Sequence, residues 1–192
     1  SKEDWGTGSR AAIAGGVTVV VDQPNTDPPL TTVQAFRERV REAARDSLCH
    51  FAVNAGVVPG APLTNLHRAG ARAFGEIFLA SSTGAKEVSP GGLGPHLSDI
   101  HALDALATIH AEESLGAEDT DLPSHDRSRP PGGEVKAIGE AKRSAPKGMS
   151  LHFCHLSTVA ALTAAFPHSS EVTPHHLLLS QEDLPADDPR GK

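Results

Sequence analysis

Apolar, β-branched runs alternate with helix-like segments along this chain, and four of these runs carry, or end in, a polar residue suited to chemistry. In chain order these residues are Asn25, Glu76, His110 and His155. Near-continuous apolar strands separated by helices are typical of a parallel sheet that is covered on both faces. In a parallel α/β barrel the reacting groups gather at the carboxyl ends of the strands. The pattern therefore predicts an α/β fold with a site at one rim of the sheet.

Six strands are expected, at residues 17–22, 50–54, 74–80, 106–111, 150–155 and 171–173. Helices are expected at residues 2–14, 31–47, 63–71, 97–104, 134–145 and 158–166, and loops at 81–95 and 115–133. No Gly-x-Gly-x-x-Gly follows the first strand, which disfavours a nucleotide-binding doubly wound sheet. A barrel of eight strand–helix units typically needs about 250 residues. We therefore expect residues 1–192 to form a single domain, an incomplete (β/α)8 TIM-type barrel with about six of the eight strands.

The composition excludes several kinds of partner. The net charge of −7 and the scattered basic residues argue against binding to nucleic acid. No apolar stretch approaches the length of a membrane span, and no charged-then-apolar signal opens the chain. Cys49 and Cys154 are too few for a disulfide framework. We therefore expect a protein of the reducing cytoplasm that binds neither nucleic acid nor a membrane.

Three of the polar residues predict a metal site. His110 and His155 each end a strand, and imidazole is a common zinc ligand, although a lone histidine at a strand end is more often a packed or surface residue. Glu76 lies inside an apolar run, where a carboxylate is costly unless it is paired or bound to a metal. Because the three groups belong to successive strands of the expected barrel, we predict that Glu76, His110 and His155 surround one cation.

Four further residues are weaker candidates. His152 lies three residues before His155, and two strand residues at that spacing point to opposite faces, so these two histidines cannot share a metal. His175 and His176 follow a proline, and both ligation and packing near the site stay open for them. Asn25 lies just past a strand end, where its amide can pair with a cyclic amide substrate or simply form a turn.

Several motifs fall in a recognisable order along the chain. They are Lys2–Trp5, Thr7–Ala12, Ala14–Thr18, Gln23–Thr26, Ile109–Glu112, Arg129–Glu134, His152–Thr158 and Glu171–Leu177. Together they resemble the dihydroorotases of the amidohydrolase superfamily, in particular the monofunctional bacterial and archaeal-like branch. Hydantoinases and allantoinases share the barrel but resemble these segments less well. The resemblance covers nearly the whole chain.

The resemblance implies a distorted barrel of the metal-dependent hydrolase kind that holds one or two zinc ions. Such an enzyme catalyses the reversible closure of carbamoyl aspartate to dihydroorotate in pyrimidine synthesis. By position, His110 and His155 match the two later histidine ligands, and Asn25 matches a substrate-contacting asparagine. Glu76 falls where many members of the superfamily carry a carboxylated lysine that bridges two metals. A native carboxylate there can bridge directly, without modification.

The resemblance also implies that part of the site lies outside the chain. A His-x-His pair and an arginine for the substrate carboxylate are expected upstream of Ser1, and the catalytic aspartate is expected beyond Lys192, so no catalytic residue is assigned. We expect the 192-residue chain alone to be inactive. Two alternatives stay open, a catalytically dead dihydroorotase-like structural partner and a hydantoinase or allantoinase. Homo-oligomerisation and docking with another pyrimidine-pathway enzyme also stay open.

Overall fold

A computed structural model describes residues 3–80, 88, 90–116, 121–180 and 183 of the chain. The strands are β1 (Val19–Asp22), β2 (His50–Val53), β3 (Ala73–Phe78), β4 (Leu106–His110), β5 (Leu151–Phe153) and β6 (Ser169–Ser170). The helices are α1 (Trp5–Ala14), α2 (Val33–Asp46), α3 (Leu63–Arg68), α4 (Pro90–Ala102), α5 (Leu122–Ser128), α6 (Pro131–Ser144), α7 (Val159–Ala165) and α8 (Pro174–Leu178). The predicted alternation of strands and helices is confirmed, and five of the six strands overlap their predicted ranges.

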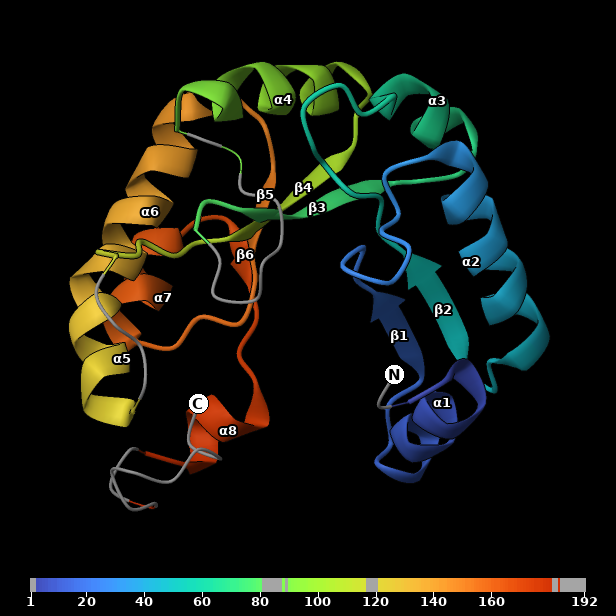
Figure 1. Ribbon diagram of the computed structural model, residues 1–192, viewed down its shortest axis with the longest axis horizontal. Coiled ribbons are helices and arrows are strands. Elements are labelled where there is room, and N and C mark those ends of the chain that lie inside the picture. Colours follow the sequence, from blue (N-terminus) through green and yellow to red (C-terminus); the bar gives the residue numbers. More distant parts are fainter. Residues whose placement is uncertain (1–2, 81–87, 89, 117–120, 181–182, 184–192) are drawn as a thin grey trace.

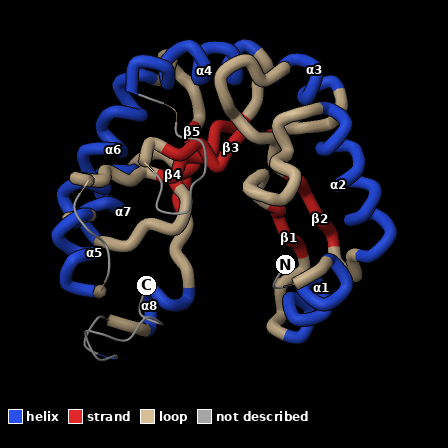
Figure 2. The backbone as a smooth tube through the Cα atoms, in the orientation of Figure 1, coloured by secondary structure: helices blue, strands red, loops and turns tan. Residues whose placement is uncertain are grey.

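All strand pairs are parallel, and the strands follow one another in chain order. β1 and β2 form one sheet and β3 to β6 a second, and a single parallel bridge between Ala55 and Phe74 joins the two. The strands line the inside of an open arc whose outside is covered by helices (Figure 1, Figure 2). β1 and α8 face each other across the open side of the arc. The fold is therefore an incomplete (β/α)8 barrel, as the sequence predicts.

Side-chain caps set the start of several helices. Asp4 accepts a hydrogen bond from the backbone N–H of Thr7 at 2.7 Å and opens α1. Thr32 and Thr158 accept from the third residue of α2 and of α7, at 3.2 and 3.1 Å. Each cap satisfies one of the N–H groups that a helix leaves unpaired at its first turn. These caps explain why the predicted and observed starts of α2 and α7 agree closely.

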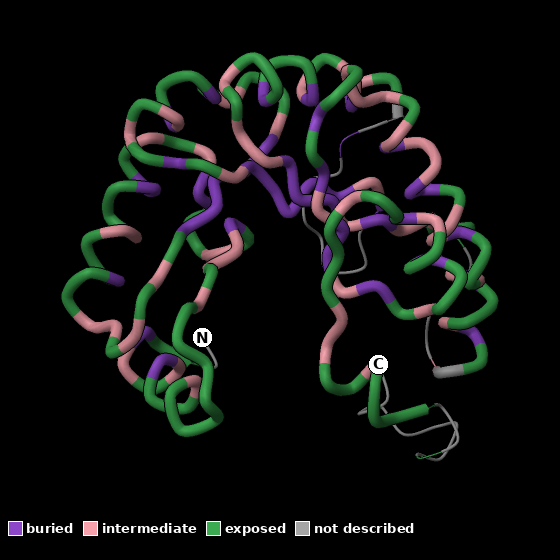
Figure 3. The backbone as a smooth tube through the Cα atoms, turned by 180° about the vertical axis from the view of Figure 1, so that it is seen from behind, coloured by how far each residue is buried: buried purple, intermediate pink, exposed green. Residues whose placement is uncertain are grey.

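The core lies between the strands and the surrounding helices. Phe74 of β3 and Phe153 of β5 are completely buried, as are Leu97 of α4 and Ile138 of α6. Figure 3 shows that burial is concentrated along β3, β4 and β5 and on the helix faces turned toward them. Burial of each such side chain contributes about 1.5–3 kcal/mol. The central strands that carry the candidate site therefore form the best-packed part of the chain.

The first strand is less covered than its sequence predicts. Val19 and Val21 are 53% and 51% exposed, although an apolar run of this kind predicts burial on both faces. Val20, which points the other way, packs against the core. The described residues leave this face of β1 uncovered. The prediction of burial on both faces is therefore wrong within the described part of the chain.

Helices replace parts of both predicted loops. Helix α4 begins at Pro90, seven residues earlier than expected, because Leu93, Leu97 and Ile100 form one buried face that outweighs the glycines in its first turns. Residues 81–87 and 89 of the predicted loop lie outside the described residues. Helix α5 lies inside the predicted loop 115–133, and its start is fixed by a capping box between Asp121 and Ser124.

The last strand also differs from the prediction. β6 pairs His152 with Ser169 and Phe153 with Ser170, two residues before the predicted start at Glu171. Glu171 still exchanges backbone hydrogen bonds with the neighbouring segment, accepting from Leu156 and donating to Phe153. Pro174, which has no N–H to donate, then opens α8. Among the residues that the structure describes, no helix has the length and apolar character needed to cross a membrane.

Candidate metal centre

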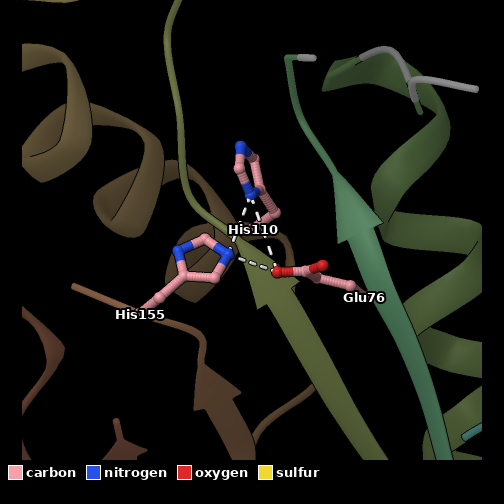
Figure 4. A group of neighbouring side chains, drawn as sticks. All are labelled: Glu76, His110 and His155. Atoms are coloured by element: carbon pink, nitrogen blue, oxygen red, sulfur yellow. Dashed lines mark hydrogen bonds and ion pairs between the residues drawn. The ribbon is translucent and has the colours of Figure 1, made fainter. Parts of the chain in front are cut away.

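Three of the four predicted site residues lie together. Glu76 belongs to β3, His110 is the last residue of β4, and His155 lies two residues past β5. Their side chains point toward one another (Figure 4). The Glu76 carboxylate is almost fully buried, with 7% of its side chain exposed, whereas the two imidazoles keep partial contact with solvent. The three neighbouring strand ends thus bring two imidazoles against one buried carboxylate.

The ligand atoms of this group nearly touch. His110 Nδ1 lies 3.1 Å from His155 Nε2 and 3.6 Å from Glu76 Oε1, and His155 Nε2 is hydrogen-bonded to the same carboxylate oxygen. Donors bound to one tetrahedral zinc at about 2.0–2.1 Å lie about 3.3 Å apart. The two distances from His110 Nδ1 suit donors of a single ion, whereas His155 Nε2 and Glu76 Oε1 lie closer than two zinc ligands and would have to separate. Two imidazoles with one carboxylate form a donor set that zinc accepts.

An irregularity in β3 turns Glu76 toward the histidines. Phe74 pairs with Ala107, but Ile77 pairs with Ile109, so β3 contains one residue more than β4 between these pairs. Gly75 lies in this irregular stretch with φ +118°, and a Cβ atom there would lie 2.1 Å from the backbone oxygen of Thr108. Only glycine fits this position, so Gly75 allows the backbone path that carries Glu76.

Mutual ionisation stabilises the group when no metal is bound. Burial raises the pKa of Glu76, but hydrogen bonds from His110 and His155 outweigh it and lower the pKa to about 2. Burial likewise lowers the pKa of His110, but its bonds to Glu112 and Glu76 outweigh this and raise the pKa to about 9. Near neutral pH the Glu76 carboxylate is therefore charged. His110 carries a proton, and its positive charge balances the carboxylate as a bound cation would.

A second carboxylate fixes the orientation of His110. The Nε2–H of His110 donates to Glu112 at 2.8 Å, and the Arg129 guanidinium donates to the other oxygen of Glu112. Burial raises the pKa of Glu112, but the charges of His110 and Arg129 overcome it and lower the pKa. Because Nε2 is bound to Glu112, Nδ1 is the nitrogen of His110 left for a metal.

The segment that carries His155 is held by Glu134 of α6. Its carboxylate accepts from the backbone N–H of Ser157 at 2.9 Å and from the hydroxyls of Ser157 and Thr158 at 3.2 and 3.0 Å. His155 itself has φ +36°, an uncommon conformation for a residue with a side chain. Three hydrogen bonds within three residues of His155 thus support a turn that the backbone alone disfavours.

Replacing Glu134 by alanine is expected to loosen this turn. Three donors would lose their acceptor, and we expect the free energy of unfolding to fall by about 1–3 kcal/mol and zinc affinity to fall by about tenfold. Chemical denaturation and zinc titration against a chelator measure the two effects. Glu140→Ala, elsewhere on α6, is the matched control. Wild-type zinc affinity in Glu134→Ala would remove Glu134 from the support of His155.

The remaining predicted residues are not members of this cluster, but His176 lies near it: burial lowers the pKa of His176, and the charges of His175 and His155 lower it further. Asn25 follows β1 and is exposed, and it is not a member of the cluster. His175 and His176 belong to α8, where their rings pack against each other at 4.5 Å between centroids. His152 belongs to a different cluster, with Cys154 and Glu171. Asp22, which ends β1, is paired with Arg39 at 2.6 Å.

Sequence reasoning did not single out Glu112, Arg129 or Glu134 as supports of the site. A signal was present for each of them. Glu112 lies two residues after His110, where a side chain can return to the same ring. Arg129 and Glu134 stand at the two ends of the Arg129–Glu134 motif, at the start of α6. What the sequence does not provide is the contact between that helix start and the ends of β4 and β5.

Comparisons with known proteins give relatives by sequence. No family model matches the chain. The dihydroorotases of Methanosarcina mazei and Halobacterium salinarum are 39% and 38% identical to it, each over 95% of the chain. The chain spans about 45% of the length of these curated relatives.

Solved structures with the same fold are cyclic amide hydrolases. The L-hydantoinase of Arthrobacter aurescens superimposes with a TM-score of 0.80 and 27% identity over 93% of this chain and 44% of that one. A dihydroorotase from Campylobacter jejuni superimposes with a TM-score of 0.63 over 87% of this chain and 49% of that one, at 17% identity, which concerns the fold alone. Sequence and structure together show that this chain is similar, along nearly its whole length, to dihydroorotases and their relatives in the amidohydrolase superfamily.

Proposed function

We propose that the protein at its full length is a zinc-dependent dihydroorotase, which interconverts carbamoyl aspartate and dihydroorotate. The observation that carries the proposal is the convergence of Glu76, His110 and His155 at the ends of neighbouring strands, in a chain 38–39% identical to dihydroorotases. Two imidazoles beside a buried carboxylate can bind a metal, and the similarity of the chain to dihydroorotases indicates which reaction the metal would serve. The finer assignment of each residue is part of the proposal.

We infer that His110 binds zinc through Nδ1, His155 through Nε2 and Glu76 through Oε1, the three atoms that converge. We propose that the second oxygen of Glu76 is the donor for a second ion where two are bound, so the site would hold one or two ions. When bound, zinc polarises a carbonyl group and lowers the pKa of a bound water. Further ligands are expected from segments outside this chain.

The reaction requires the residues of this chain mainly to position groups. In the hydrolytic direction, the oxygen of water bonds to the ring carbonyl carbon, the carbon–nitrogen bond breaks, and the ring nitrogen takes a proton. Glu112 holds the imidazole of His110 for this step, and Glu134 holds the turn that carries His155. Asn25 is proposed to pair with the ring amide by donating and accepting hydrogen bonds. The proton acceptor is expected on a further strand.

The competing function is that of a hydantoinase or dihydropyrimidinase, favoured by the close superposition on the Arthrobacter L-hydantoinase. A substrate panel on the full-length protein separates the two. Dihydroorotate carries a carboxylate, whereas hydantoin and dihydrouracil do not. We expect turnover of dihydroorotate and carbamoyl aspartate to exceed that of the uncharged rings by at least about 100-fold. Preference for an uncharged ring would overturn the dihydroorotase assignment, and no turnover with zinc bound would favour a structural partner.

The pH dependence of zinc binding follows from the proton on His110. The pKa of that imidazole is about 9 without metal, so zinc must displace a proton at any lower pH. Apparent zinc affinity should therefore rise about tenfold per pH unit up to about pH 9 and level off above it. Competition with a chelator across this range measures the slope. An affinity that is constant between neutral pH and pH 9 would show that His110 is not a ligand.

The proposed substrate is a small anion. Both described cysteines, Cys49 and Cys154, are free thiols. Free thiols suit a reducing compartment, and we propose that the protein acts in the cytoplasm.

Val19 and Val21 of β1 and the exposed leucines of α8 lie on the two sides of the open arc. We propose that these apolar surfaces are covered in the protein at its full length, either by its own further strands or by a second subunit.

A further inference from the structure

Two side-chain amides meet at the carboxyl ends of β1 and β2. Gln23 and Asn54 directly follow these strands, and the Nδ2–H of Asn54 donates to Gln23 Oε1 at 3.2 Å. Asn54 is 4% exposed and Gln23 is half-buried, and a buried amide is costly unless it is paired. The backbone alone joins the strands here, through the N–H of Asn54 and the oxygen of Asp22 at 2.9 Å, so strand pairing does not require the two amides.

The amide pair lies on the same face of the strands as the candidate metal centre. On β2, Val53 packs in the core, so Asn54 faces the other way. On β4, Ile109 packs in the core, so His110 also faces away from it. Asn54 and His110 both lie at the carboxyl ends of parallel strands. Face and end are therefore shared by the amide pair and the metal centre.

A short backbone path joins the amide pair to Glu76. Ala55, the residue after Asn54, accepts a hydrogen bond from the N–H of Gly75 at 2.9 Å, and Gly75 directly precedes Glu76. Ala55 also donates its N–H to Ala73 at 3.1 Å, so the ends of β2 and β3 are fixed to each other on both sides of this residue. Paired strands lie about 4.8 Å apart. The amide pair is thus one strand away from the buried carboxylate of the metal centre.

The bond to Asn54 determines which end of the Gln23 amide is left for a ligand. Because Gln23 Oε1 accepts from Asn54, the NH2 group at Gln23 Nε2 points away from Asn54 and keeps its protons for another acceptor. Among the residues that the structure describes, Asn54 is the one side-chain partner of Gln23. A neutral NH2 group beside a metal centre suits an oxygen of the substrate.

We propose that Gln23 binds the substrate through its side-chain NH2 group, and that Asn54 is the positioning residue that turns this group toward the substrate. The acceptor is a carbonyl or carboxylate oxygen of dihydroorotate or carbamoyl aspartate. This inference rests on the proposed function and deepens it, because it names two residues outside the metal centre that determine how well the substrate binds.

Two isosteric variants of the full-length zinc protein test the two roles by steady-state kinetics. Gln23→Glu keeps the acceptor for Asn54 but replaces the NH2 group by an oxygen. Asn54→Asp removes the donor, so Gln23 turns its NH2 group toward residue 54 and presents Oε1 to the substrate. In both variants we expect KM for dihydroorotate to rise by at least about tenfold, with kcat within about threefold of wild type and zinc content unchanged. A purely structural role of Asn54 would lower stability and leave KM unchanged.

Gln34→Glu is the matched control, because it makes the same chemical change at an exposed position in the first turn of α2. Its KM should stay within about twofold of wild type. Circular dichroism checks folding, and if Gln23→Glu does not fold, Gln23→Met removes the NH2 group without adding a charge and should raise KM in the same direction.

The outcomes separate this inference from the proposed function. Unchanged KM in the Gln23 variant or in Asn54→Asp, or a raised KM that comes with loss of zinc, would overturn the roles of the amide pair while the protein remains a dihydroorotase. A wild-type protein that does not turn over dihydroorotate would overturn the proposed function and this inference with it.

Discussion

Glu76→Gln is expected to remove zinc from the site formed by Glu76, His110 and His155. It should also lower turnover of dihydroorotate by about 1,000-fold or more, equivalent to about 4 kcal/mol of transition-state stabilisation. Glutamine has the size of glutamate, so packing around β3 is kept and only the charge and the ligand oxygen are lost. The site would then offer two imidazoles and a neutral amide, a poor donor set for zinc. Metal content by mass spectrometry and the steady-state rate of the full-length protein measure the two effects.

Glu113→Gln is the matched control for this experiment. Glu113 lies on the segment that follows β4 and pairs with the exposed Lys136, and it contacts none of the three proposed ligands in the described residues. Its replacement should change zinc content and rate by less than about twofold, since a pair of this kind contributes little. Full zinc content together with an unchanged rate in Glu76→Gln would remove Glu76 from the metal site.

Gly75→Ala is expected to lower the free energy of unfolding by about 3 kcal/mol or more. The new Cβ would lie 2.1 Å from the backbone oxygen of Thr108, and backbone atoms of β4 cannot move aside without breaking the strand pairing. The residue would also keep φ +118°, which disfavours any side chain. Denaturant unfolding of the full-length protein measures the loss.

Gly70→Ala separates the two causes. Gly70 has φ +120°, almost the same as Gly75, but a Cβ there meets nothing within 4 Å. It should therefore cost only the conformational strain, about 1 kcal/mol. Equal losses in the two variants would show that β4 does not press on Gly75, and the account of how β3 presents Glu76 would then fail.

The fold class can be predicted from the sequence because most of the strands are short apolar runs and each is followed by a helical segment. The pattern that marks β3 and β4 is local, and so is the position of Glu76, His110 and His155 near strand ends. Parallel order places the three on neighbouring strand ends, and the irregularity at Gly75 and the turn at His155 then direct their side chains toward one another. The three predicted ligands therefore lie beside one another in the structure.

Other features depend on contacts between distant segments. The pairing of Glu112 with Arg129 spans 17 residues, and the contact of Glu134 with Ser157 spans 23. The start of α4 depends on burial of Leu93, which outweighs the glycines around it. The exposure of Val19 depends on what lies beside β1 in space. None of these can be read from local composition, because each is decided by a neighbour that the sequence order does not reveal.

The most direct test of the account is the position of zinc in a crystal of the full-length protein, located by anomalous scattering at the zinc edge. The account predicts a peak bonded to Glu76, to His110 through Nδ1 and to His155 through Nε2, with the Nε2–H of His110 still donated to Glu112. Zinc bound to His110 through Nε2, or a rim without zinc near Glu76, would contradict it.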